Sequence, residues 1–286
     1  MVGVKYFVKT ALATGLLALS ILLFTSDNSG LLADVRYLGF DRNDYPGDSS
    51  LKILRSRFSF VGFWLNNPPG TTSNSWAGKR GTVQGLGFGF LVVFNGRIVA
   101  QIRAAADATK LGASDGVTAV SSARREGFPG RTIIFLDQEE GGRLLPEQRA
   151  YLHGWADAVQ SGGFRPGVYC SGIAFKEGSG ATVITAEDIR QNAAGRQLAY
   201  WVTNDLCPPS PGCVLTGKPP NPAASGVPFA DVWQFAQSPR RVEFTSGCPA
   251  NYSNDGNCYP PGGEAEQLHV DLDVALSTDP SHGRTR

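Results

Sequence analysis

Short apolar runs recur along the chain, and most of them are separated by stretches long enough for a helix. Eight runs have the length and the β-branched and aromatic content typical of strands. They cover residues 37–41, 59–65, 88–94, 132–137, 167–170, 198–202, 231–235 and 269–274. Because strands that alternate with helical patterns are typical of βα units, this order favours a parallel sheet over a sandwich.

Helical periodicity is clearest in two of the intervening stretches, residues 114–126 and 146–160. Ser114 or Asp115 could cap the first helix, and Pro146 suits the first turn of the second, which Gly162 would end. Apolar residues of the second helix recur at spacings of three and four. This helix is therefore expected to bury one face, and Trp155 is expected to belong to the core.

Eight strands with intervening helices in about 255 residues match the size and order of a single α/β domain, a (β/α)8 TIM-type barrel. We place this domain at residues 34–280. The last quarter is somewhat irregular, because residues 207–228 and 238–267 are rich in Pro, Gly and Asn and show little helical pattern. We interpret these two segments as long loops on the same barrel.

The first 30 residues differ in kind from the rest. Lys5 and Lys9 precede an apolar run at residues 10–25, and the polar sequence SDNSG follows it. A basic segment before a short apolar run is what the secretion machinery recognises. Residues 1–30 are therefore predicted to be a signal peptide or an uncleaved signal anchor, and the protein is expected to be exported, either secreted or associated with the cell envelope. Membrane contact is expected only through this segment, if it stays uncleaved.

Composition and charge narrow the classes of protein further. With 42% hydrophobic residues, the chain can bury a substantial core. Its formal net charge is +1, and removal of residues 1–30 takes away Lys5, Lys9 and Asp27 and lowers this charge to 0. A nucleic-acid partner, which needs a basic face, is therefore not expected.

Five cysteines fit an oxidising compartment. Four of them lie in the two loop segments, and the preferred disulfides join Cys207 with Cys213 and Cys248 with Cys258, although four cysteines allow three pairings. Cys170 lies in a strand-like segment, where a buried free thiol is expected. The spacings match no zinc motif, so neither a metal nor a cofactor is predicted.

Acidic residues cluster where predicted strands end. Asp41 ends the first strand, Asp137 and Glu139 end the fourth, and Asp271 and Asp273 lie in the eighth. In a parallel barrel the working groups lie at the carboxyl ends of the strands, so these acids are the candidates for a functional site. Because Asp271 and Asp273 share a face, only one of them is expected at the mouth of the barrel.

Asp137 and Glu139 form the most specific of these groups. Successive side chains of a strand point to opposite faces, so these two acids share one face while Gln138 points away. Glu140 is expected to be a solvated loop residue. Repulsion and partial burial should raise the pKa of one carboxyl and leave an acid protonated beside an ionised partner. Cleavage of a glycosidic bond requires such a pair.

Aromatic residues on the same strands could bind a sugar, because an aromatic face stacks on the apolar face of a pyranose. Adjacent aromatic residues on a strand point in opposite directions, so only one of Tyr200 and Trp201 faces the interior. We select Trp233, Tyr169 and Tyr200 as candidates for the substrate cleft.

Six short motifs follow one another along the chain: GFDRND, FVGFWL, IIFLDQE, GFRPGVYCSG, DVWQF and HVDLDVA. On these motifs the chain resembles the lysozyme-type barrels of glycoside hydrolase family 25, from residue 37 to residue 275. More closely, it resembles the bacterial glycoside hydrolase-like domain family of unknown function that is related to them.

The resemblance implies roles for the acids at the strand ends. Glu139 would be the proton donor and Asp137 would assist it, while Asp41 and Asp271 would complete an acidic floor. The resemblance also implies a cell-wall polysaccharide as partner, with muramidase-type cleavage of peptidoglycan between N-acetylmuramic acid and N-acetylglucosamine.

Three functions remain open at this point. The first is an exported glycoside hydrolase that acts on cell-wall glycan by carboxylate acid–base catalysis. The second is a wall-glycan-binding barrel without turnover, which the departure from the family 25 pattern at DRNDYPGD favours. The third is a metal-dependent phosphodiesterase in which the four acids hold Mg²⁺ or Ca²⁺, with His269 as the one histidine placed to join them.

Overall fold

The computed structural model describes Met1 and residues 35–178, 180–205, 218–237 and 270–285. Eight strands close into one barrel in the order β1-β10-β9-β8-β5-β4-β3-β2. Every predicted strand overlaps one of them, so the predicted eight-stranded α/β barrel is confirmed. Their bounds are β1 (Tyr37–Asp41), β2 (Phe60–Trp64), β3 (Gly89–Asn95), β4 (Ile133–Asp137), β5 (Arg165–Ser171), β8 (Ala199–Thr203), β9 (Val232–Ala236) and β10 (Asp271–Ala275).

The direction of the last strand departs from the prediction. β10 runs antiparallel to both of its neighbours, β1 and β9, whereas all other neighbouring strands of the barrel are parallel. The expectation of a wholly parallel sheet is therefore wrong at β10. A period of two along the sequence is the same in both directions, so the pattern of β10 predicts a strand without showing which way it runs.

Helices and a small hairpin accompany the barrel. The two predicted helices are present as α4 (Ala108–Glu126) and α5 (Pro146–Ser161). α4 begins earlier than predicted, because the Asp107 carboxylate caps it by accepting a hydrogen bond from the Lys110 N–H at 3.0 Å. The shorter elements are α1 (Asp48–Leu54), α2 (Arg80–Gly85), α3 (Val99–Ala104), α6 (Thr185–Gln191), the 3₁₀ helix η1 (Pro222–Ala224) and a hairpin of β6 (Ala174–Lys176) and β7 (Thr182–Ile184).

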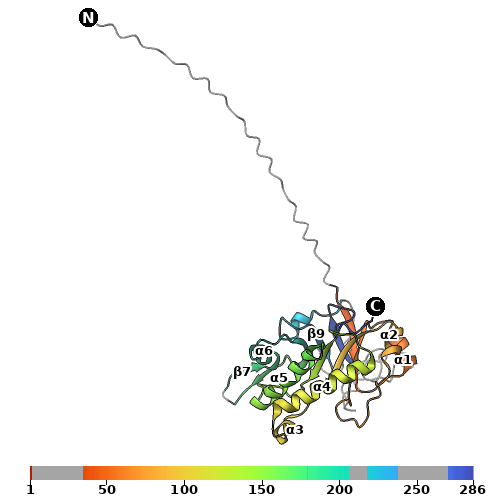
Figure 1. Ribbon diagram of the computed structural model, residues 1–286. Helices are drawn as coiled ribbons and strands as arrows, with labels where there is room; N and C mark the ends of the chain where they lie inside the picture. Colours follow the sequence, from red (N-terminus) through yellow and green to blue (C-terminus); the bar gives the residue numbers. More distant parts are fainter. Residues whose placement is uncertain (2–34, 179, 206–217, 238–269, 286) are drawn as a thin grey trace. The chain divides into compact units, whose positions relative to one another are not determined.

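α4 and α5 lie side by side on one side of the barrel (Figure 1). Glycines let their backbones approach closely, since a Cβ at Gly154 would lie 2.1 Å from the carbonyl oxygen of Thr109. Trp155 is fully buried at this contact, as its place in the apolar stripe predicted. The two helices therefore pack closely together, and α5 also contacts β5.

The C-terminal segment packs against the amino ends of β3 and β4. Ser281 donates its N–H to the carbonyl oxygen of Phe90 at 2.9 Å and accepts the N–H of Ile133 at 2.8 Å. Further along, Arg284 donates to the carbonyl oxygen of Phe88 at 2.9 Å. Residues beyond the predicted domain end at 280 thus bond to the barrel, at the end opposite to the acidic strand ends.

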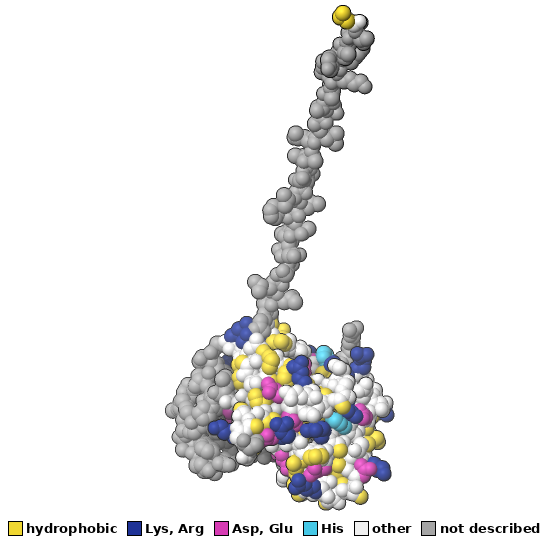
Figure 2. All heavy atoms as spheres, turned by 90° about the vertical axis from the view of Figure 1, so that its left-hand side faces the viewer, with side chains coloured by type: hydrophobic (Ala, Val, Ile, Leu, Met, Phe, Trp, Pro, Cys, Tyr) yellow, Lys and Arg dark blue, Asp and Glu magenta, His cyan; other side chains and the backbone are white. Residues whose placement is uncertain are grey.

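Some predictions concern residues outside the described part of the chain. The signal segment at 1–30 and the four cysteines proposed for disulfides belong to this group. Cys170 is described, and it is a buried free thiol, as predicted; burial raises its pKa. Within the described residues, no helix combines the length and the apolar content that a membrane span needs. On the face drawn in Figure 2, basic and acidic side chains are interspersed over the described residues.

One carboxyl group lies inside the barrel. Asp273 of β10 is fully buried, and its Oδ1 accepts a hydrogen bond from the indole Nε1 of Trp201 at 2.9 Å. Burial raises the pKa of Asp273 well above its usual value, and the nearby carboxyls of Asp41 and Asp271 add to the shift. Burial therefore favours the protonated form of Asp273, which makes the stability of the barrel depend on pH.

We predict that Gly154→Ala destabilises the protein by about 1–3 kcal/mol, because the added methyl group has no room against the backbone of α4. Urea unfolding measures the change. Gly81→Ala in α2 is the matched control, since no atom lies within 4 Å of a Cβ placed there. The control should leave stability unchanged or raise it by up to about 1 kcal/mol. Equal urea midpoints of unfolding for Gly154→Ala and wild type would contradict the close packing of α4 against α5.

We predict that Asp273→Asn is more stable than wild type at pH 8, by about 1 kcal/mol or more, and that the difference shrinks toward pH 4. Asp273 has a higher pKa in the folded state than in the unfolded state, so folding favours uptake of a proton. Its contribution to the free energy of unfolding is therefore fully present below the pKa of the unfolded state, and it is lost as the pH rises through the pKa of the folded state. Asparagine does not titrate, so the variant does not lose this stability as the pH rises, and its side-chain oxygen can still accept the hydrogen bond from Trp201. Unfolding by urea at pH 4, 6 and 8 tests this, with Asp44→Asn on the surface as control. A stability difference that does not grow with pH would count against it.

Candidate active site

Three acidic side chains meet at one end of the barrel. Asp41 ends β1 and Asp137 ends β4, so both lie at the carboxyl ends of parallel strands. Asp271 begins β10, and because β10 is antiparallel it stands opposite Asp41 in the register of the two strands. Asp271 thus reaches the mouth as predicted, although by the reversal of its strand, and Asp273 lies one layer deeper.

A glutamine links the acids on β1 and β10. Gln234 of β9 is buried, and its Nε2 donates to Asp41 Oδ2 at 2.8 Å and to Asp271 Oδ2 at 3.4 Å. Its Oε1 accepts the hydroxyl of Tyr169 at 2.7 Å. The amide therefore holds two carboxyl groups together and connects them with β5.

The position beside Asp41 has no space for a side chain. A Cβ at Gly62 of β2 would lie 2.5 Å from Asp41 Cβ. Glycine at this position in FVGFWL lets the Asp41 side chain lie directly against the neighbouring strand β2.

Asp137 is buried at the end of β4. Its Oδ1 has no hydrogen-bond partner among the described residues. Burial raises the pKa of Asp137 well above its usual value, and the negative charges of Glu139 and Asp41 raise it further. Burial therefore favours the neutral form of the Asp137 carboxyl.

Glu139 differs from Asp137 in its surroundings, because it is exposed beyond the end of β4. It lines two clefts, one on each side of it. The cleft on the β3 side has a volume of about 630 Å³, and we call it the amide cleft because its polar lining includes Asn66, Asn67, Asn95 and Gln101. The cleft on the β5 side has a volume of about 470 Å³, and we call it the hairpin cleft because Phe175 of β6 lines it.

The amide cleft also contains an arginine that is held in place. Arg97 pairs with Asp115 of α4 through two hydrogen bonds, Nε to Oδ2 at 2.7 Å and Nη2 to Oδ1 at 2.9 Å. The hydroxyl of Tyr151 on α5 donates a hydrogen bond to Asp115 Oδ2 at 2.9 Å. Asp115 was predicted as a possible helix cap, but it lies inside α4, where it positions Arg97.

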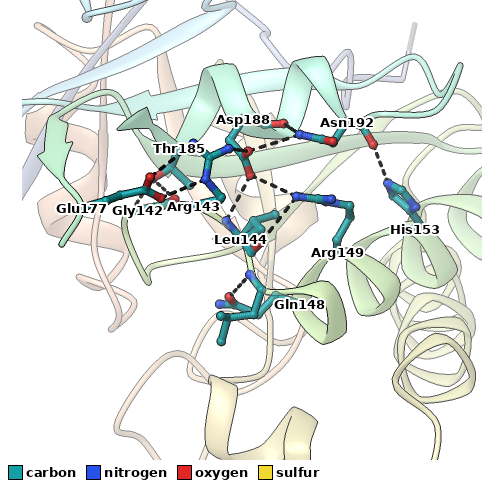
Figure 3. Close-up of polar contacts among 11 residues, drawn as sticks. Gly142, Arg143, Leu144, Gln148, Arg149, His153, Glu177, Thr185, Asp188 and Asn192 are labelled. Atoms are coloured by element: carbon teal, nitrogen blue, oxygen red, sulfur yellow. Dashed lines mark hydrogen bonds and ion pairs between the residues drawn. The ribbon is translucent and has the colours of Figure 1, made fainter. Parts of the chain in front are cut away.

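α6 fastens the segment that follows Glu139. Thr185 donates its hydroxyl to the carbonyl oxygen of Gly142 at 2.9 Å and accepts the N–H of Gly142 at 2.8 Å. Asp188 accepts the N–H of Leu144 at 3.1 Å. Figure 3 shows these contacts between the segment and α6. Gly142 and Leu144 are therefore anchored to a helix that the sequence pattern did not predict.

Arg143 connects the same segment with the hairpin. It donates to Asp188 Oδ1 at 3.2 Å and to Glu177 Oε1 at 2.9 Å (Figure 3). Asp188 is buried and also lies 3.6 Å from Arg149 of α5. One buried carboxylate thus joins the segment, the hairpin and α5.

Glu140 is anchored rather than solvated, which corrects the prediction. Its carboxylate accepts the N–H of Val99, at the start of α3, at 3.0 and 3.1 Å. It also accepts a hydrogen bond from Nε2 of Gln148 on α5 at 2.9 Å. A carboxylate is stabilised at the amino end of a helix, so Glu140 fixes the chain directly after Glu139.

Of the three aromatic candidates, only Tyr169 lies at the mouth. Tyr200 packs on Phe229 outside the barrel, with ring centroids 4.9 Å apart. Trp233 also points outward and donates its Nε1 to the carbonyl oxygen of Asn204 at 2.8 Å. The selection of Tyr200 and Trp233 for the cleft is therefore wrong, because strand alternation places both on the outer face.

Sequence reasoning missed two kinds of site residue. Gln234 follows Trp233, and the period of two that turns Trp233 outward turns Gln234 inward, so the signal was present in DVWQF. Arg97 and Phe175 lie outside the predicted strands, where no periodicity indicates their direction. Among the described residues, no three His, Cys, Asp or Glu side chains are arranged to hold a metal ion. His269 lies outside these residues.

Several solved structures are similar to this chain. An uncharacterized protein of B. stearothermophilus is 20% identical, with 84% of this chain and 95% of that chain covered and a TM-score of 0.50. The Tat-secreted protein Rv2525c of Mycobacterium tuberculosis is 16% identical, with 88% and 98% covered and a TM-score of 0.47. A family 25 glycosyl hydrolase from Bacillus anthracis is 11% identical, with 84% and 89% covered and a TM-score of 0.46. At 20% identity, the similarity to the B. stearothermophilus protein shows a shared fold.

A family comparison gives a more specific result. No curated protein matches the chain at a significant level. The model of the Rv2525c-like, glycoside hydrolase-like domain matches residues 52–207, just over half of the chain, and this stretch includes Asp137 and Glu139. Asp41, Gln234 and Asp271 lie outside it and join the site through the closing strands of the barrel. The chain belongs to the Rv2525c-like, glycoside hydrolase-like domain family.

Proposed function

We propose that this protein is a glycoside hydrolase that acts on cell-wall glycan, with Glu139 as the proton donor. The position of Glu139 carries this proposal. It is exposed between the amide cleft and the hairpin cleft, and the buried Asp137 lies two residues before it in the chain. A glycan that occupies both clefts would have one of its linkages above Glu139.

The family and the clefts support a glycan as the substrate class. The family is described as glycoside hydrolase-like. Both cleft volumes fall within the range of about 300–1,000 Å³ that is usual for ligand sites. The predicted export segment supports a substrate outside the cytoplasm, and the resemblance to lysozyme-type barrels supports peptidoglycan, with muramidase-type cleavage.

The reaction begins with transfer of the Glu139 proton to the glycosidic oxygen. The bond between this oxygen and the anomeric carbon breaks, and the leaving sugar departs as an alcohol. Positive charge develops on the ring that remains, and the carboxyl groups of Asp41 and Asp271 stabilise it. Water then adds to the anomeric carbon and returns a proton to Glu139. The net reaction consumes one water molecule and releases a new reducing end.

Asp137 assists by hydrogen bonding, and its burial favours the neutral form of the carboxyl. Its Oδ1 has no partner among the described residues, and Asp137 lines the amide cleft. A protonated carboxyl can donate as well as accept a hydrogen bond. Asp137 is therefore suited to hold the acetamido group of a substrate sugar beside Glu139.

We predict that Glu139→Gln lowers the release of reducing ends from purified peptidoglycan by about 10²- to 10⁴-fold, because glutamine cannot donate the proton. Glu187→Gln on α6 is the matched control, because Glu187 lines neither cleft, and it should cleave like wild type. Equal release of reducing ends by wild type and Glu139→Gln would contradict the assignment of Glu139 as the proton donor. Retention on insoluble peptidoglycan without any release, by wild type as well, would identify a glycan-binding barrel without turnover.

A further inference from the structure

The hairpin cleft has two chemically different walls. Two large apolar side chains on one wall are exposed, Ile173 by 53% and Phe175 by 55%. Polar groups line the rest of the cleft; they are Ser171, Thr203, Asp205, Gln237 and the hydroxyl of Tyr169. An exposed aromatic ring beside a wall of hydrogen-bonding groups suits a ligand that is itself apolar on one face and polar at its rim.

The hairpin that carries Phe175 is held in a defined position. Glu177 on the chain after β6 pairs with Arg143 at 2.9 Å, and Arg143 also bonds to the buried Asp188 of α6 (Figure 3). The Phe175 ring lies against Gly142, where a Cβ would be 3.5 Å from the ring. Gly142 has a φ of +92°, which favours glycine there. Phe175 is therefore positioned by the same segment that carries Glu139.

The polar wall is also prepared for hydrogen bonding. Asp205 accepts the N–H of Gln237 at 3.0 Å, and the Gln237 side chain donates to Gln234 Oε1 at 3.1 Å and to the Tyr169 hydroxyl at 3.3 Å. These contacts join the wall to the network around Asp41. The hairpin cleft is thus continuous with the acidic site through both of its walls.

We propose that Phe175 is the stacking platform for a pyranose ring of the substrate, in the subsite next to Glu139 on the β5 side. The ligand class is a β-linked pyranose with equatorial substituents, since such a ring presents a flat C–H face to an aromatic ring and hydroxyl groups at its edge. Ile173 extends the apolar wall, and Thr203 and Asp205 face the hydroxyl rim. This inference rests on the proposed glycan binding and names the residue that selects the ring.

Binding of β-1,4-linked N-acetylglucosamine hexamer by isothermal titration calorimetry tests the platform without need for turnover, in a Glu139→Gln background. We expect Phe175→Ala to raise the Kd by about threefold to tenfold, the range of aromatic contact energies. Phe175→Trp should restore the affinity, because it keeps a flat ring. Val117→Ala on α4 removes an exposed apolar side chain that lines neither cleft, and it should leave the Kd unchanged.

Turnover of peptidoglycan separates this proposal from the proposed catalysis. If wild type cleaves, Phe175→Ala should raise KM while kcat stays within about twofold, because the lost contact is made equally in the ground state and the transition state. A Kd and a KM equal to those of wild type would overturn the platform and leave the catalytic proposal intact. A Kd that depends on Phe175 in a protein that never cleaves would support the platform and overturn the catalysis.

Discussion

Burial of carboxyl groups inside a closed barrel is the constraint on which the candidate site depends. Asp41, Asp271 and Asp273 lie on the inward faces of two neighbouring strands, and Asp137 ends a third. Removal from water disfavours the charged form of each, so the barrel must supply hydrogen-bond donors or keep protons on the acids. Gln234 supplies donors for two of them, and burial raises the pKa values of Asp137 and Asp273, which favours their neutral forms.

This arrangement separates the acids by role. The buried acids form a floor with a limited number of charges, whereas Glu139 lies above it at the surface. A proton donor has to reach its substrate, and an exposed position between two clefts allows this. The groups that stabilise charge need a fixed, partly dry position, which the strand ends provide. One strand and the two residues after it thus deliver two acids to different environments.

Glu139 is exposed, but hydrogen bonds fix the chain that follows it. Glu140 is bonded to the start of α3 and to α5, and Gly142 and Leu144 are bonded to α6. Arg143 extends the same set of contacts to the hairpin. A rigid segment keeps a catalytic group in place without the entropy cost of ordering it on binding. It also places the proposed Phe175 platform at a fixed position relative to the proton donor.

The sequence by itself determined the eight strands, the two long helices and the positions of Asp41 and Asp137 at one end of the barrel. Alternation of apolar and polar residues carries this information, because a strand reveals which residues share a face. The same alternation identifies Tyr169 and Gln234 as inward residues. The prediction that Trp233 and Tyr200 line the cleft is wrong, because alternation directs both side chains to the outer face of the barrel.

Only the tertiary structure decided the rest. The direction of β10 leaves no trace in a pattern of period two, and that direction is what places Asp271 rather than Asp273 at the mouth. The raised pKa of Asp137 depends on its burial, which the neighbours in space determine. Arg97 and Phe175 reach the clefts from connections between strands, and their direction follows from contacts with α4, Gly142 and the segment after Glu139. Local pattern therefore determined which residues face inward, and long-range packing determined which of them meet.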